Sequence, residues 1–376
     1  MKKTLAAVAV LGAFAGSAIA ADVTLYGRID EGLLYQRVDA DQPHQSADNS
    51  WGLESGNMTG SRFGIKGSEQ ISEDLTVSFT LEQGFTPDDG SFGDDDRMFN
   101  REASLRVTTA YGELGFGRMG RILSDAGTYS QRGQFILGSS WGGMTGGTEV
   151  ITDATSSRLD NMITYKSPTF AGMTVYAQYA GGDTAKADSE EENTSKTDRY
   201  YGLAAVGNWG ALSAMLGVEQ TNYKSYVNGV GTDPDDSVGV EASVAYDFGV
   251  VKTSLTGRYF KNGNGYNTFV DDIYDIERVD GYGVKLAAAA PVFGGTLQGM
   301  VGYMDAESSD DTEFGDFEVS RYTVAVTYDY PLSKRTKLYT AASYTKDDFE
   351  NHDVADGSAD GKPNNTAFMF GMAHYF

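Results

Sequence analysis

The sequence of 376 residues contains no cysteine, and it has only 7 prolines and 3 histidines. The lack of cysteine excludes disulfides, zinc–thiolate sites and cysteine nucleophiles. After the N-terminus, no segment offers the roughly 18 consecutive apolar residues that a membrane-spanning helix needs. Basic residues are few, because 29 lysines and arginines stand against 53 acidic residues and leave a net charge of −24. Such a negative surface argues against nucleic acid as a partner.

Glycine (47) and tyrosine (23) are abundant by contrast. Together with the scarcity of proline, they favour a chain of many strands and do not fit a disordered one. The mean hydropathy is negative. This value excludes a helical membrane protein, but it is compatible with strands of which only alternate residues face lipid.

The first twenty residues have the pattern of a cleaved secretory leader. Lys2 and Lys3 form a basic start, an apolar stretch runs from Leu5 to Ala15, and residues 18–20 form a small-x-small cleavage site. We expect residues 1–20 to be removed. The rest, 21–376, then forms one domain with a net charge of −26, because two lysines leave with the leader.

The last eleven residues, 366–376, alternate strictly, as a half-buried strand does. The positions that share one face are Phe368, Phe370, Met372, His374 and Phe376. An aromatic residue at the C-terminus is typical of a strand that closes a membrane barrel and is read by the insertion machinery. We therefore predict that Gly371, His374 and Phe376 belong to a barrel-insertion signal.

The same alternation recurs along the chain, for example over residues 74–85, 102–108 and 321–330. Seven short connections of turn-forming residues alternate with eight long ones, at 38–57, 87–96, 120–157, 181–197, 222–236, 261–277, 305–319 and 347–364. Fifteen connections join sixteen strands. This plan predicts an all-β fold, a 16-stranded antiparallel transmembrane barrel with short periplasmic turns and long extracellular loops. In the alternative, a soluble sandwich, the apolar faces would form a core.

Acidic residues are concentrated in the long connections, as in 88–96, 188–192, 305–313 and 347–353. Their simplest role is to keep exposed loops solvated. They are also compatible with a vestibule that attracts cations, or with divalent bridges to lipopolysaccharide phosphates. None of them shows the fixed spacing of a calcium-binding loop, so the sequence predicts no metal site and no cofactor.

Several segments, taken together and in order, resemble the general-diffusion porins of Gram-negative outer membranes, closest to the beta-proteobacterial type. These segments are ADVTLYGRID (21–30), GSRFGIKGSE (60–69), YGELGFGRMGR (111–121), NMITYKSPTFAGMTVYAQY (161–179), YPLSKRTKLYTAASY (330–344) and GMAHYF (371–376). The resemblance implies a homotrimer in the outer membrane, passive diffusion of ions and small hydrophilic solutes, and a third long loop that folds into the barrel.

The third long connection, 120–157, supports that last implication by its composition. It is the longest connection, it carries few charges, and glycines alternate with Phe135, Ile136, Leu137 and Trp141. A loop this long and apolar is expected to pack against a wall, where glycines permit close approach of the backbone. The alternative is packing against another subunit, or a contact of the loop tip outside the pore.

A selective pore needs fixed charges at its narrowest point, where low-dielectric walls focus the field. The residues that the alternation places on the lumen face, or that the loop brings to it, are Arg28, Arg62, Lys66, Glu102, Arg106, Asp125, Arg158 and Asp160. The family pattern places basic residues at Arg28, Arg62 and Arg158. Asp125, in the descending part of the loop, is the acidic candidate opposite them. We expect weak charge selectivity.

Other functions stay open at this stage. A substrate-specific channel would stack aromatic residues along its path, and a structural or adhesin barrel would have no open pore. An enzyme is disfavoured, because His44, His352 and His374 have no evident serine partner to form a catalytic pair.

Overall fold

The structure is a computed structural model of the chain. It describes residues 22–41, 47–93, 97–124, 126–135, 158–182, 197–223, 226–227, 230–231, 235–264, 278–309, 316–351 and 360–376. The predicted leader, Asp125 and residues 136–157 of the third connection lie outside these ranges.

The described residues form strands and one 3-10 turn. In chain order the elements are β1 (Asp22–Asp39), β2 (Asp48–Ser55), β3 (Arg62–Ser72), β4 (Leu75–Gly84), β5 (Glu102–Thr109), β6 (Gly112–Gly120), η1 (Arg132–Gln134), β7 (Arg158–Lys166), β8 (Met173–Gly181), β9 (Arg199–Trp209), β10 (Leu212–Asn222), β11 (Tyr226–Val227), β12 (Val230–Gly231), β13 (Ser237–Asp247), β14 (Lys252–Asn264), β15 (Arg278–Val292), β16 (Gly295–Ser308), β17 (Phe317–Pro331), β18 (Thr336–Asn351) and β19 (Asn364–Tyr375). Among the described residues, no helix has the length and apolar character that crossing a membrane would require.

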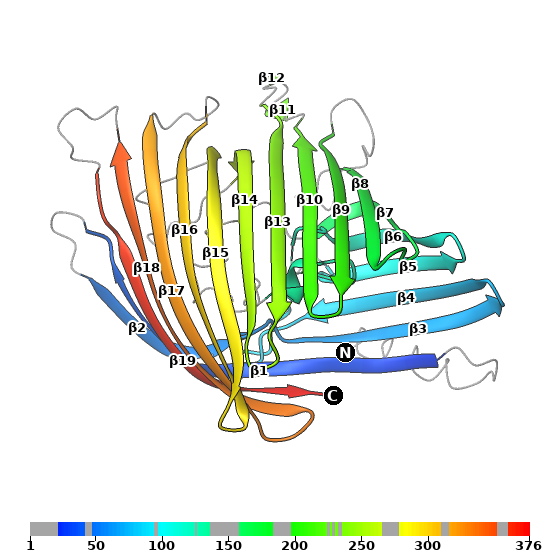
Figure 1. The fold of residues 1–376 in the computed structure, drawn as a ribbon, viewed down its shortest axis with the longest axis horizontal. Coiled ribbons are helices and arrows are strands. Elements are labelled where there is room, and N and C mark those ends of the chain that lie inside the picture. Colours follow the sequence, from blue (N-terminus) through cyan, green and yellow to red (C-terminus); the bar gives the residue numbers. More distant parts are fainter. Residues whose placement is uncertain are drawn as a thin grey trace.

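All strands except the small β11–β12 hairpin belong to one antiparallel sheet that closes on itself (Figure 1). From β3 onward each strand of this sheet pairs with the next strand of the sheet, and β19 returns to pair with β1 from Arg28–Tyr375 to Asp39–Asn364. β2 and β3 both pair with β1, along different parts of its length, so together they occupy one strand position. The described chain therefore forms a closed 16-stranded barrel, as predicted.

The alternation predicted from the sequence separates the two faces of the wall. On β19, Phe368 and Phe370 are 52 % and 57 % exposed, whereas Ala367 and Met369 are 0 % and 3 % exposed. Large exposed hydrophobic side chains recur at every second position of the other strands, and threonines, serines and charged residues occupy the positions between them. An apolar outer face around a polar inner face is the arrangement that lipid outside and water inside require.

Glycines at the closure of the barrel make room for aromatic rings. Gly371 lies directly opposite both Tyr339 of β18 and Gly32 of β1. A side chain at Gly371 or Gly32 would collide with the Tyr339 ring, which crosses β19 to reach β1. Gly27 makes room in the same way for the ring of Phe376. Small residues in register therefore let three strands pack tightly where the chain ends meet.

Several strand boundaries differ from the sequence prediction. Residues 48–55, predicted to lie within a loop, form β2, and the chain leaves the wall only at 56–61. Asp305 and Glu307 lie in β16, and Asp347 and Asp348 lie in β18, rather than in loops. In each of these strands, pairing with a neighbouring strand continues the ladder past the point where the apolar alternation ends.

Candidate pore constriction

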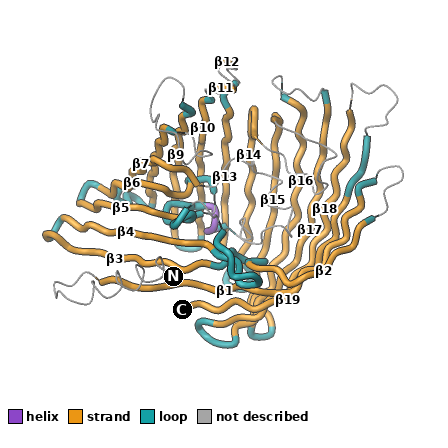
Figure 2. Tube along the Cα trace, turned by 180° about the vertical axis from the view of Figure 1, so that it is seen from behind, coloured by secondary structure: helices purple, strands orange, loops and turns teal. Residues whose placement is uncertain are grey.

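The described part of the connection after β6, residues 121–124 and 126–135, packs on the inner face of the wall (Figure 2). Ile122, Leu123, Tyr129 and Phe135 are buried in one apolar cluster. The strand residues of that cluster are Met119, Leu159, Met162, Tyr176, Ala180, Tyr200, Ala204, Val206, Met215 and Ala245. These contacts extend over β6 to β13, so the segment crosses the inside of the barrel.

A buried group of charges fixes this segment to the far wall. Arg132 of η1 donates to Glu241 of β13, with Nη2–Oε2 at 2.5 Å and Nε–Oε1 at 3.2 Å. Arg258 of β14 lies between two carboxylates, 2.6 Å from Glu219 and 3.4 Å from Glu241. Arg121, at the start of the segment, is 3.5 Å from Glu219. Buried charges of this kind persist only when they are paired and hydrogen-bonded, which favours one position of the segment.

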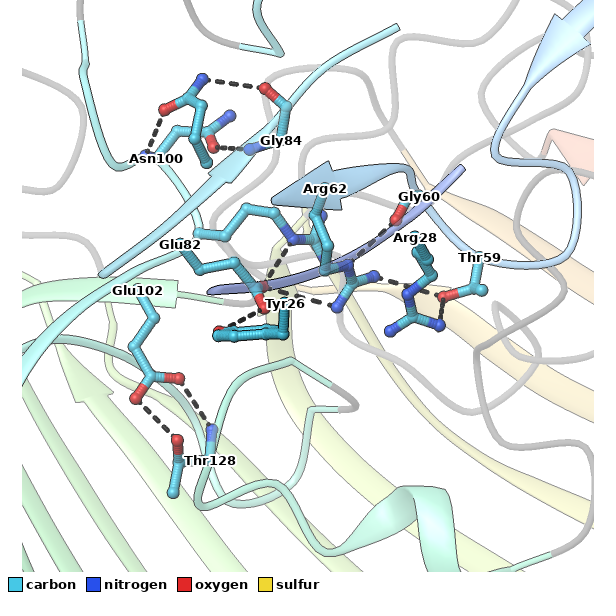
Figure 3. Close-up of polar contacts among 12 residues, drawn as sticks. Tyr26, Arg28, Thr59, Gly60, Arg62, Glu82, Gly84, Asn100, Glu102 and Thr128 are labelled. Carbon is cyan, nitrogen blue, oxygen red and sulfur yellow. Dashed lines mark hydrogen bonds and ion pairs between the residues drawn. The ribbon is translucent and has the colours of Figure 1, made fainter. Parts of the chain in front are cut away.

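Two carboxylates on the near wall hold the same segment. Glu102 of β5 accepts hydrogen bonds from the Thr128 amide (3.0 Å) and the Thr128 hydroxyl (2.7 Å) (Figure 3). Glu113 of β6 accepts the Tyr129 hydroxyl at 2.9 Å. Burial and the nearby carboxylate of Glu113 raise the pKa of Tyr129 above its ordinary value, so the phenol stays protonated and able to donate. Glu102, predicted as a charge of the constriction, thus serves to hold the loop.

Arg106 shares in this arrangement. Its Nη1 donates to Glu102 (3.2 Å), Ser104 (3.0 Å) and Thr80 (3.0 Å). A guanidinium and a carboxylate in direct contact nearly cancel at a distance, so the pair adds little to the field in the lumen.

Arg28 and Arg62 lie directly opposite each other on β1 and β3. Figure 3 shows both guanidinium groups beside Thr59, whose hydroxyl oxygen accepts Arg28 Nη1 at 3.0 Å and Arg62 Nη2 at 3.2 Å. Arg62 Nε also donates to the carbonyl of Gly60 at 3.0 Å. Like charges directly opposite each other in a sheet repel, so a shared uncharged acceptor helps to hold this pair in place.

Further charged residues lie next to Arg28 and Arg62. We call the group of Arg28, Arg62, Arg101 and Arg158 the basic wall. Glu82 of β4 is 3.5 Å from Arg62 and 2.9 Å from Arg101, and it accepts the Tyr26 hydroxyl at 3.0 Å. Lys66 lies over the Tyr26 ring at 4.9 Å. Arg158 is close enough to act on Arg62 electrostatically, as Arg28 and Arg101 also do. Two arginines therefore pair with Glu82, and two more, Arg28 and Arg158, lie within electrostatic range of Arg62.

Asp160 of β7, predicted as a charge of the constriction, is paired with two arginines, and its place in the constriction stays a prediction. Its carboxylate binds Arg118 at 2.6 Å and Arg97 at 2.7 Å. Arg118 lies opposite Ala103, on the face that Leu105 shares and that points away from the lumen. The β6–β7 register shifts between Gly117 and Met119, and this bulge is what the strict alternation did not anticipate.

Arg101, Thr59 and Arg132 are residues that sequence reasoning missed. Arg101 precedes the first paired residue of β5, and Thr59 lies in a turn. The alternation of apolar and polar residues therefore does not assign either side chain to the inner or the outer face of the wall. Of the predicted insertion signal, His374 Nδ1 lies 2.9 Å from the Thr336 hydroxyl, and Gly371 and Phe376 take part in the closure described above.

Comparisons with known proteins place this architecture in a family. The family model described as Gram-negative porin matches residues 6–350. An outer membrane porin protein of Bordetella pertussis is 31 % identical, over 92 % of this chain and 94 % of that protein. Outer membrane porin protein 32 of Delftia acidovorans is 28 % identical, over 92 % of this chain and 90 % of that protein.

Solved structures agree on the fold. An anion-selective porin from Comamonas acidovorans superposes with a TM-score of 0.63 at 23 % identity, covering 95 % of this chain and all of that one. The family and the fold point to a channel rather than an enzyme. The chain belongs to the Gram-negative porin family and is a general diffusion channel of the bacterial outer membrane.

Proposed function

We propose that the channel is narrowest between the basic wall of Arg28, Arg62, Arg101 and Arg158 and the loop segment of residues 121–124 and 126–135, and that it is weakly selective for anions. The observation that carries this proposal is the double attachment of the segment, to Glu102 and Glu113 on one side and to Glu219 and Glu241 on the other. A segment held across the lumen narrows the water-filled path. It also brings that path close to the arginines.

The sign of the selectivity follows from the nearest charges. Four arginines stand against the two carboxylates of Glu82 and Asp30, so the wall keeps an excess of positive charge. Charges farther than about 8 Å from the ion path are screened at physiological salt, so the nearest charges dominate. Arginine suits this role because it stays charged at every relevant pH. The excess stays modest, since Glu82 offsets part of it and Arg106 is already paired.

Removal of wall arginines tests this proposal. In planar bilayers under a salt gradient, we expect Arg62→Ala and Arg158→Ala each to shift the reversal potential toward cation preference. Arg335→Ala, which removes an exposed arginine from the β17–β18 turn, is the matched control and leaves the potential unchanged. If both wall variants keep the ion preference of the parent channel, the constriction is elsewhere.

The remaining parts of the proposal concern assembly. A homotrimer, a cleaved leader at 1–20, contact with lipopolysaccharide and recognition of Gly371, His374 and Phe376 by the barrel-assembly machinery all fit the family. So does the absence of catalytic activity. Mass determination of the mature protein in detergent would test the trimer and the cleavage site together.

A further inference from the structure

The turn between β2 and β3, residues 56–61, departs from the wall in an unusual way. On β1, Arg28 and Glu31 are three residues apart, but their partners Arg62 and Ser55 are seven apart. The partner strand therefore carries four extra residues opposite Ile29 and Asp30. Gly56, with φ +76°, begins the turn in a conformation that favours glycine.

Asp30 holds this turn. Its side chain is fully buried, and Oδ2 accepts the amides of Met58 (3.1 Å) and Thr59 (2.8 Å). Its backbone is bonded as well, because its amide donates to Ser61 Oγ at 2.9 Å and its carbonyl accepts the Gly56 amide at 2.8 Å. A buried carboxylate with several donors is a strong local restraint.

Tyr339 holds Asp30 in turn. The Tyr339 ring passes over Gly371 and Gly32, which have no side chains to block it, and its hydroxyl donates to Asp30 Oδ1 at 2.6 Å. Met58 packs in the apolar cluster that contains Tyr339. The turn is therefore fixed both by a hydrogen-bonded carboxylate and by burial of a side chain.

The fixed turn presents Thr59 to the basic wall. Thr59 Oγ1 accepts both Arg28 and Arg62, so its position sets the separation of two guanidinium groups that would otherwise repel each other. We propose that Asp30 and Tyr339 are positioning residues for the constriction: they fix the 56–61 turn so that Thr59 spaces Arg28 and Arg62, and this spacing sets the ion preference. The inference rests on the proposed constriction.

The test is Thr59→Val, which removes the shared acceptor and keeps the shape of the side chain. The arginines then separate, and the chloride-to-potassium permeability ratio falls roughly two- to fivefold, the range expected when a charge moves about 2 Å away from the ion path in a medium of intermediate dielectric. Thr59→Ser keeps the acceptor and retains the parent ratio. Tyr339→Phe, which frees Asp30 Oδ1, shifts the ratio in the same direction as Thr59→Val.

Matched controls separate positioning from loss of stability. Thr345→Val alters a buried threonine pair elsewhere on the inner wall, and Tyr328→Phe removes a tyrosine hydrogen bond near the β15–β16 turn. Both controls keep the parent ratio, even where they lower the unfolding temperature. The ratio is measured from reversal potentials on purified protein whose far-ultraviolet circular dichroism matches the parent.

Comparison with Arg62→Ala distinguishes a failure of the positioning role from a failure of the proposed constriction. If Arg62→Ala shifts the ratio and Thr59→Val does not, the positioning role is overturned and the constriction stands. If neither variant shifts it, the constriction itself is overturned, and the positioning role with it.

Discussion

Removal of Arg132 is expected to loosen the third loop without unfolding the barrel. In the parent protein Arg132 and Glu241 are 4 % and 0 % exposed and share two hydrogen bonds. Removing one partner of a buried ion pair costs about 3–5 kcal/mol. Because Arg258 still faces Glu241 at 3.4 Å, we take the lower end, about 3 kcal/mol. The strand ladders do not involve Arg132, so this cost falls on docking of the loop.

The magnitude can be converted into a measurable population. Each 1.4 kcal/mol is about a factor of ten, so about 3 kcal/mol raises the undocked fraction of residues around η1 by on the order of a hundredfold. The chain has no cysteine, so Phe135→Cys introduces a unique thiol directly after η1, at a position that is 3 % exposed while the loop is docked. We expect Arg132→Ala to speed its modification by a bulky water-soluble reagent by a similar factor and to increase open-channel current noise.

Two variants control this experiment. Arg335→Ala removes an exposed arginine and leaves the thiol rate unchanged. Arg132→Met combined with Glu241→Gln removes both charges of the pair while keeping side-chain volume. It should undock the loop less than Arg132→Ala alone, which leaves the buried Glu241 carboxylate without its two hydrogen bonds from Arg132. An unchanged thiol rate in Arg132→Ala would refute the view that this ion pair holds the loop.

Two further predictions concern the barrel closure and pH. Gly371→Ala places a methyl group against the Tyr339 ring and should lower the unfolding free energy by about 1–3 kcal/mol, the usual cost of overpacking, seen as a lower heat-unfolding temperature. Gly299→Ala, whose new atom would find its nearest neighbour at 3.7 Å, should be nearly neutral. The raised pKa of Tyr129 means that its contribution to loop docking is complete below the ordinary tyrosine pKa of about 10 and is lost as pH rises above it. Current noise should therefore be constant from neutral pH to about pH 9 and then rise, and Tyr129→Phe should remove this dependence.

The barrel was predictable because the patterns that specify its strands and turns lie within short stretches of the sequence. Outward positions such as Leu105 and Phe370 follow a period of two, and turn residues mark each short connection. The same alternation placed Arg28 and Asp30 on the inner face, where the structure has them. Pairing in register then needs only neighbouring strands, which the chain supplies in order.

The constriction was less predictable because its contacts are distant in sequence. Arg132 meets Glu241 and Tyr339 meets Asp30 across 109 and 309 residues, and no short motif announces either pair. The register shift between β6 and β7 was not predictable either, because alternation carries no signal for a bulge.

The barrel is a wall of hydrogen-bonded strands with lipid on one side and water on the other. Single cysteines at Leu105 and Thr108, on opposite faces of β5, test it most directly. Thr108→Cys should react with a charged, membrane-impermeant thiol reagent and lose conductance, whereas Leu105→Cys should react only with a lipid-soluble one. The opposite pattern, in which Leu105→Cys reacts with the charged reagent and Thr108→Cys reacts only with the lipid-soluble one, would contradict this arrangement of the two faces.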